Sequence, residues 1–130
     1  MKHVSEHGVT YDVPPGLELD TEAKFEVYRD SGRHHAVRLT IETAAGTPET
    51  FLAAKHPSAK IWSTDNDGTP TSYARWSGTT LRFASAAVAR DGKVYELTCS
   101  SDDMTTEKTD AVCTQILKTL RLAAGGLPGE

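Results

Sequence analysis

The sequence has few of the residues that metal sites, disulfide frameworks and membrane spans require. Its 130 residues include only two cysteines, and aromatic residues make up 7% of the chain. No further cysteine or histidine accompanies either cysteine at metal-ligand spacing, which argues against a zinc site. No apolar run approaches the roughly 20 residues that span a bilayer, so we expect no transmembrane segment.

Charge and short motifs exclude further classes. Lys and Arg number 14 against 18 Asp and Glu, a net charge of -4, and the basic residues are scattered. A protein that binds nucleic acid needs a clustered excess of basic residues, so we do not expect this chain to bind nucleic acid. The chain has no G-x-S-x-G motif and no glycine-rich phosphate loop. The sequence therefore predicts a protein that is not an enzyme and uses no cofactor.

The two ends of the chain set its expected domain organisation. MKHVSEHGVTY lacks the apolar region of a signal peptide, so the chain is either cytosolic or a mature form without its leader. AAGGLPGE at the other end is typical of a solvated tail. We expect one domain over residues 1–122 and a flexible tail over residues 123–130.

Alternating apolar and polar residues predict strands in the first third of the chain. GVTYDV (8–13) alternates and stops at Pro14-Pro15-Gly16. KFEVYR (24–29) and AVRLTIET (36–43) alternate in the same way and are joined by a polar loop. They predict a hairpin.

A short helix is expected in the middle of the chain. Thr47 suits the N-cap, Pro48 suits the first helical position, and His56-Pro57 ends the segment. Two further hairpins follow it. One joins residues 59–65 to 69–78, and the other joins 80–90 to 93–100 through Asp91-Gly92, which suits a type I′ turn.

A long helix is expected to close the fold, from about Met104 to Leu122, with Asp102 or Asp103 as its cap. One of its faces is apolar and carries Cys113, Ile116, Leu117 and Leu120. The fold class is therefore α+β: an antiparallel sheet of about six to seven strands, one short central helix, and a long C-terminal helix that covers the sheet.

The two cysteines are expected to meet between sheet and helix. Cys99 shares its side of a strand with Leu97, and Cys113 shares its helical face with Ile116. A disulfide between them would stabilise the fold by about 3 kcal/mol in the chain-entropy model. Two buried free thiols are the alternative, while a redox role would need a C-x-x-C motif. A disulfide implies an oxidising compartment.

Three stretches carry a family resemblance: GVTYDVPPGLEL, DGKVYELTCSSDDM and AVCTQILKTLRL. In their order they resemble the PsbP-like fold, which is shared with the Ran-binding Mog family and with bacterial lipoprotein domains of the LpqN and DcrB kinds. The resemblance implies a non-enzymatic accessory or binding role and no catalytic residues. A lipoprotein carries a lipobox cysteine near its start, and none precedes Cys99 here.

Candidate metal ligands are weak. His34-His35 lies in a loop near Asp30, and solvated loop histidines account for it better than a metal site. DNDG (65–68) is not an EF-hand, because Ser63 and Ala74 stand where carboxylates are needed. It is expected to form a turn.

An aromatic and basic set is the candidate partner surface. If Ile61, Ala74 and Trp76 face the core, their strand neighbours face outward. Residues of these types dominate binding hot spots. The predicted surface consists of Tyr28, Arg38, Trp62, Tyr73 and Arg75.

These observations predict an exported or lipoprotein-derived accessory domain, in the periplasm or at the cell surface, that binds another protein through an open sheet face. The alternative is a cytosolic chaperone or immunity-type protein that sequesters a secreted effector or toxin. Reduced thiols and exposed apolar surface would favour the alternative, and an oxidised pair would favour export.

Overall fold

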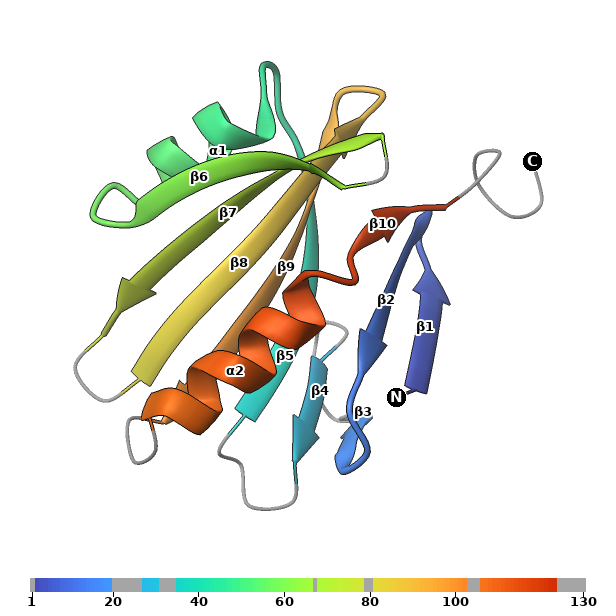
Figure 1. Ribbon diagram of the computed structural model, residues 1–130. Coiled ribbons are helices and arrows are strands. Elements are labelled where there is room, and N and C mark those ends of the chain that lie inside the picture. The colour runs from blue at the N-terminus through green and yellow to red at the C-terminus, as the bar shows by residue number, and fades with distance from the viewer. Residues whose placement is uncertain are drawn as a thin grey trace.

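The computed structural model describes residues 2–19, 27–30, 35–66, 68–78, 81–102 and 106–123. These residues form ten strands and two helices (Figure 1). The helices are α1 (Pro48–Lys55) and α2 (Thr106–Leu117). The strands are β1 (Lys2–Glu6), β2 (Val9–Val13), β3 (Leu17–Leu19), β4 (Val27–Asp30), β5 (His35–Thr43), β6 (Lys60–Asn66), β7 (Thr69–Ser77), β8 (Leu81–Arg90), β9 (Lys93–Asp102) and β10 (Arg121–Leu122).

The main sheet has seven strands in the order β3-β4-β5-β9-β8-β7-β6, and every neighbouring pair is antiparallel. This confirms the predicted α+β class, the antiparallel sheet and the three hairpins. Asp91 and Gly92 join β8 to β9 with φ angles of 55° and 77°. Both values are positive, as a type I′ turn requires.

A second, three-stranded sheet was not predicted. Its order is β1-β2-β10, so the first predicted strand (8–13) lies here and not in the main sheet. β10 pairs with β2, which lies far from it in the sequence, and Leu122 is opposite Val9. Arg90 of β8 donates to the carbonyl of Gly8 over 2.9 Å, which links the two sheets. Figure 1 shows this small sheet beside the main one.

The predicted long terminal helix is wrong in length, because α2 ends at Leu117. The backbone N–H of Thr119 donates to the carbonyl of Ile116 (3.0 Å), and that of Leu120 donates to Leu117 (3.3 Å). Such i to i+3 bonds tighten and end a helix. The Thr119 hydroxyl also donates to the carbonyl of Ile116 over 2.6 Å. The chain then pairs with β2 as β10.

The predicted helix cap is also changed. Asp102 is the last residue of β9, and Asp103 lies outside the described residues. The expected apolar face of the helix is confirmed, because its four residues are buried, although Leu120 lies just beyond the helix: Cys113, Ile116, Leu117 and Leu120.

Other elements pack on both faces of the main sheet, where one buried face was expected. α2 and the small sheet pack on one face and enclose the larger core cluster, which includes Tyr11, Leu97 and Ile116 (Figure 1). α1 packs on the other face, where Leu52 meets Ala74, Ala87 and Val94. β7, β8 and β9 therefore bury residues on both of their faces.

The predicted central helix and its cap are confirmed. The backbone N–H of Thr50 donates to the Thr47 hydroxyl over 3.1 Å, and Pro48 opens the helix. The helix ends at Lys55, and His56 is its C-cap residue. The short helix thereby delivers Lys55 and His56 to the face of the sheet.

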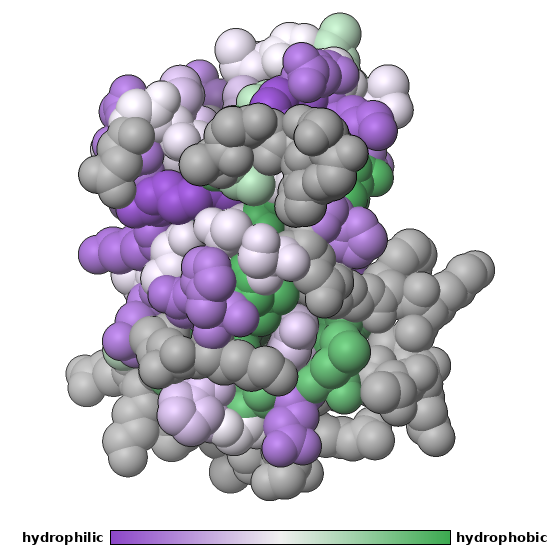
Figure 2. Space-filling model, turned by 90° about the vertical axis from the view of Figure 1, so that its right-hand side faces the viewer, coloured by the Kyte–Doolittle hydropathy of each residue, from purple (hydrophilic) through white to green (hydrophobic). Residues whose placement is uncertain are grey.

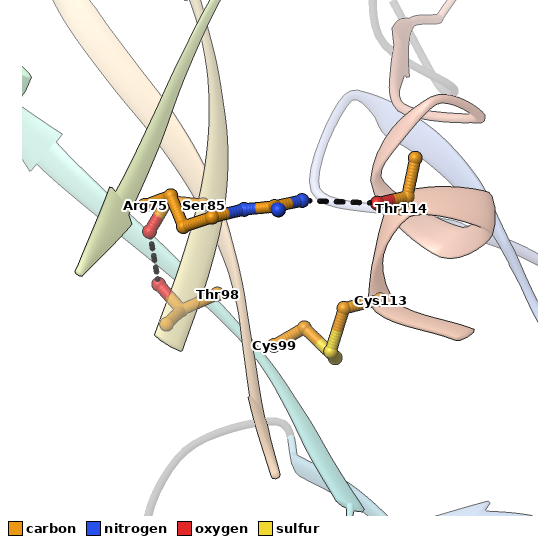
Figure 3. The surroundings of a disulfide bond; sticks show 6 residues. All are labelled: Arg75, Ser85, Thr98, Cys99, Cys113 and Thr114. Atoms are coloured by element: carbon orange, nitrogen blue, oxygen red, sulfur yellow. Dashed lines mark hydrogen bonds between the residues drawn. A yellow bond between two sulfur atoms is a disulfide. The ribbon is translucent and has the colours of Figure 1, made fainter. Parts of the chain in front are cut away.

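A disulfide joins Cys99 on β9 to Cys113 on α2, with the two Cα atoms 5.6 Å apart (Figure 3). Both cysteines are buried. The disulfide predicted from the sequence is therefore confirmed, and it ties α2 to the sheet.

In the described part of the chain, no helix is both long and apolar enough to cross a membrane. Of the predicted tail, residues 124–130 lie outside the described residues.

Candidate functional site

Three of the five predicted surface residues lie around one cavity. Trp62 on β6 is opposite Tyr73 on β7, and Arg75 lies two residues further along β7 on the same face. This is the face that α2 covers, since Tyr73 packs in the same core cluster as Leu117. The cavity opens between β6, β7, β8 and the end of α2, with a volume of about 420 Å³. That is within the range of ligand pockets.

Stacked aromatic rings line one side of the cavity. The rings of Trp62 and Tyr73 lie 5.5 Å apart at an angle of 17°. Asn66 donates to the Tyr73 hydroxyl over 2.6 Å and holds that ring in place. Trp62 remains 40% exposed, so it presents a fixed aromatic surface at the opening. Ala84 and Leu117 complete the apolar lining.

Basic side chains surround the same cavity. Arg75 contributes from β7, Lys118 follows α2 directly, and Arg121 belongs to β10. Arg75 donates to the Thr114 hydroxyl over 3.2 Å, across the gap between sheet and helix (Figure 3). Arg121 donates to the carbonyls of Lys118 and Leu120. Sequence analysis missed Lys118 and Arg121, because there they are only polar positions of an amphipathic helix.

Two expectations about the predicted surface are wrong. Tyr28 and Tyr73 were expected to be exposed, but they are 4% and 7% exposed. The ring of Tyr28 packs edge-on against Tyr11 of the small sheet, with 6.3 Å between centroids. Both tyrosines lie on the face that α2 and the small sheet cover, so these positions, which were expected to face outward, are buried.

Arg38 is exposed, as expected, but it does not line the cavity. It lies opposite Thr98, while its neighbours Val37 and Leu39 pack in the α2-side core. Arg38 therefore lies on the other face of the sheet. The five residues do not form one surface, and the cavity brings together Trp62, Tyr73 and Arg75.

The three residues that were expected to face the core, Ile61, Ala74 and Trp76, do so. Ala74 is buried, and Ile61 and Trp76 pack against it on the α1 side. The three residues thus contribute to the smaller core cluster. They face a core, as predicted, and their neighbours Trp62, Tyr73 and Arg75 face the cavity on the opposite side.

A buried carboxylate forms a second polar site on the α1 face, which sequence analysis did not find. Glu96 on β9 is 1% exposed. It accepts hydrogen bonds from Lys55 Nζ (2.7 Å), Ser85 Oγ (2.6 Å) and His56 Nε2 (2.9 Å). An ionised carboxylate only accepts, so Nε2 of His56 carries a hydrogen. The only signal in the sequence was a charged residue in the centre of an alternating strand.

These contacts determine the charge states of Glu96 and Lys55. Burial alone would raise the pKa of Glu96, but the hydrogen bonds from Lys55, Ser85 and His56 outweigh it and hold the pKa below its usual range. Burial alone would lower the pKa of Lys55, but its hydrogen bonds with Glu42 and Glu96 raise it. Both groups are therefore ionised at neutral pH.

The Glu96 site is closed by aromatic stacking. The His56 ring lies 3.8 Å from the Trp76 ring, and Trp76 stacks on Phe83 at 5.3 Å. Ser85 is fully buried and its hydroxyl donates to Glu96. The cluster links Lys55 and His56, at the end of α1, to β8 and β9.

The described residues contain no group of three or more His, Cys, Asp or Glu side chains that could hold a metal ion. His3 pairs with Asp12 over 2.7 Å, and His34 lies outside the described residues. In the expected turn after β6, the backbone N–H of Gly68 donates to Asp65 over 2.6 Å. Asp67 also lies outside the described part.

Figure 2 views the molecule from the side of the small sheet. Outside the grey residues, its apolar atoms form small areas separated by hydrophilic and near-neutral side chains. Broad apolar patches mark docking surfaces, and this face shows none among the residues drawn in colour. The cavity beside Trp62 is the better candidate.

Comparisons with known proteins show the fold. Neither a protein-family profile nor a curated protein matches this sequence. The solution structure of cyanobacterial PsbP (CyanoP) from Synechocystis sp. PCC 6803 is similar at 12% identity, with a TM-score of 0.65, over 93% of this chain and 91% of that one.

The Ran-binding protein Mog1p from Saccharomyces cerevisiae is similar at 14% identity, with a TM-score of 0.58, over 93% of this chain and 94% of that one. A Bacteroides thetaiotaomicron protein matches over 95% of this chain but 47% of its own length, with a TM-score of 0.59 and 9% identity. The resemblance to the PsbP and Mog fold is confirmed at the level of fold. The nearer likeness to LpqN and DcrB domains stays a prediction.

Proposed function

We propose that this chain is a non-enzymatic accessory domain that binds a protein partner at the cavity beside Trp62. The observation that carries the proposal is the exposed Trp62 ring, stacked on Tyr73 and placed beside Arg75 at an open cavity. Trp, Tyr and Arg are the residues that most often dominate binding energy at interfaces. The yeast structure of the same fold is described as Ran-binding, which supports a protein partner.

The proposal places the domain outside the cytoplasm, as an exported or lipoprotein-derived protein of the LpqN or DcrB kind. The Cys99–Cys113 disulfide supports this, because disulfides persist mainly in oxidising compartments. The same disulfide weighs against the cytosolic chaperone or immunity role, for which reduced thiols were expected. The domain over residues 1–122, with a flexible tail, is part of the proposal.

Site-specific cross-linking tests the binding role. The photoreactive residue p-benzoylphenylalanine replaces Trp62 in one variant and Lys93, at the exposed β8–β9 turn, in a control. Irradiation in the native host is expected to join the position-62 variant to one defined protein and the control to none. Equal labelling from both positions, or no protein adduct from position 62, would refute the proposal. Unchanged circular dichroism and disulfide formation show that both variants fold.

A further inference from the structure

We infer that the partner presents an acidic segment, which inserts one aromatic or other apolar side chain against Trp62 and sets its carboxylates against the surrounding basic residues. This inference rests on the proposed function and names the chemistry of the partner. The apolar part follows from the stacked rings of Trp62 and Tyr73, with Ala84 and Leu117 beside them. The acidic part follows from the distribution of charge.

Two further hollows adjoin the cavity and share Arg75 with it. One follows α2 and is lined by Thr114, Gln115 and Lys118. The other lies toward β8 and is lined by Lys60, Arg82 and Phe83. Because all three hollows meet at Arg75, an extended segment several residues long fits them better than a single small molecule.

The described side chains that line these three hollows include five basic residues and no Asp or Glu: Lys60, Arg75, Arg82, Lys118 and Arg121. The chain as a whole has a net charge of -4. Among the described side chains, positive charge is therefore gathered around these hollows, while the chain as a whole is acidic. Such segregation attracts an acidic partner and repels a basic one.

The local geometry favours an acidic peptide over a nucleic acid. Trp62 and the basic residues could stack a base and pair with phosphates. However, phosphate binding depends on a basic excess over a long surface, and the remainder of this chain is acidic. A peptide with a few carboxylates and one apolar side chain matches the limited size of the cavity, about 420 Å³.

Defined peptides test the inference. The probes are the capped pentapeptides Glu-Glu-Phe-Glu-Glu, Glu-Glu-Ala-Glu-Glu and Lys-Lys-Phe-Lys-Lys, titrated into isotope-labelled wild-type protein and followed by NMR. The first is expected to bind about tenfold more tightly than either of the others. The difference from the lysine peptide comes from charge complementarity, and the difference from the alanine peptide comes from burial of the phenylalanine ring against Trp62. The shift changes that the first peptide causes are expected at Thr64, Thr114 and Leu117, which line the cavity.

A matched pair of charge reversals locates the effect. Lys118→Glu is expected to weaken binding of the acidic phenylalanine peptide about tenfold, whereas Lys93→Glu, an equal change of charge at the β8–β9 turn, leaves it within about twofold. Both side chains are exposed, so neither change removes core packing. Trp62→Ala is expected to abolish the difference between the phenylalanine and alanine peptides.

Four outcomes would overturn the inference: equal binding of acidic and basic peptides, shift changes away from the cavity, equal effects of the two reversals, or tighter binding of 3-phenylpropionate or of a thymidine oligonucleotide than of the peptide. A protein adduct at position 62 together with any of these keeps the proposed function and removes only the inference. If position 62 gives no protein adduct and 3-phenylpropionate binds, both the proposed function and the inference are removed.

Discussion

Lys55 Nζ lies 2.7 Å from Oε1 of Glu96, a carboxylate that is 1% exposed. The same ammonium lies 2.8 Å from Glu42, which is 46% exposed at its side chain. One cation therefore pairs with a buried anion and with an exposed one. The two pairs contribute differently to stability, because charge pairs near water are screened by solvent and salt, and pairs with a buried member much less.

Lys55→Met is expected to lower the free energy of unfolding by about 2 kcal/mol, because it leaves a buried carboxylate with fewer donors. Ser85 and His56 still donate to Glu96, which limits the loss. Glu42→Gln, which removes only the exposed partner, is expected to cost less than about 1 kcal/mol. Urea denaturation measures both. Equal losses would show that the buried pair has no special role.

The Glu96 site also predicts a pH dependence. The pKa of Glu96 is lower in the folded than in the unfolded chain, where its ordinary value is 4.5. Its ionised form therefore contributes stability above pH 4.5, and this contribution is lost as the pH falls through the folded pKa. Lys55 has the opposite sign: its contribution is present below pH 10.5 and is lost as the pH rises further.

Glu96→Gln is expected to flatten the acid side of this profile, while its stability at neutral pH falls. The measurement is the urea midpoint of both proteins as the pH is lowered through 4.5. An unchanged acid slope in the variant would assign the acid dependence to other carboxylates.

Reduction of the disulfide is expected to lower the free energy of unfolding by about 3 kcal/mol, because it releases the constraint on the unfolded loop between Cys99 and Cys113. Denaturation of the wild-type protein with and without a reducing agent measures this. The double variant Cys99→Ala/Cys113→Ala is the control, since a reducing agent should not change its stability. A loss below about 1 kcal/mol would mean that packing alone holds α2 on the sheet.

The state of these cysteines in the cell tests the compartment. Protein from its native host, alkylated under denaturing conditions before reduction, is expected to take up no label at Cys99 or Cys113, and to take up two labels after reduction. Intact mass distinguishes the two states. Immediate labelling of both thiols would place the chain in a reducing compartment and favour the cytosolic sequestering role.

The β8–β9 turn predicts an effect that depends only on the backbone. A Cβ at Gly92 would meet nothing within 4 Å, yet its φ is 77°. Gly92→Ala is therefore expected to cost about 1–2 kcal/mol through backbone strain alone. Asp91→Asn is the control and is expected to be neutral, because Asn tolerates positive φ. A neutral Gly92→Ala would show that the turn changes its type.

Elements with local signals were predictable. α1 begins at Thr47 and Pro48 because the Thr47 hydroxyl accepts a hydrogen bond from a backbone N–H of the first turn, and because the φ angle of proline suits the first helical position. Asp91 and Gly92 join the longest hairpin because both accept positive φ. Cys113, Ile116 and Leu117 are buried together because a helix repeats every 3.6 residues.

The site was predictable only in part. Trp62, Tyr73 and Arg75 share one face by strand alternation, and the structure brings them to one cavity. Alternation could not reveal that Tyr28 and Tyr73 are buried, because it separates two faces without stating which of them another element covers. Arg121 joins the site because the chain leaves α2 and turns toward β2.

The amino-acid sequence by itself thus determined the local elements and the alternation of side chains along each strand, and it predicted the pairing of the two cysteines. Tertiary structure alone decided the small sheet, the end of α2 and the buried Glu96 cluster. The reason is that Leu122 and Val9, or Glu96 and Lys55, lie far apart in the sequence. Such contacts depend on how the whole chain packs, and local propensity carries no information about it.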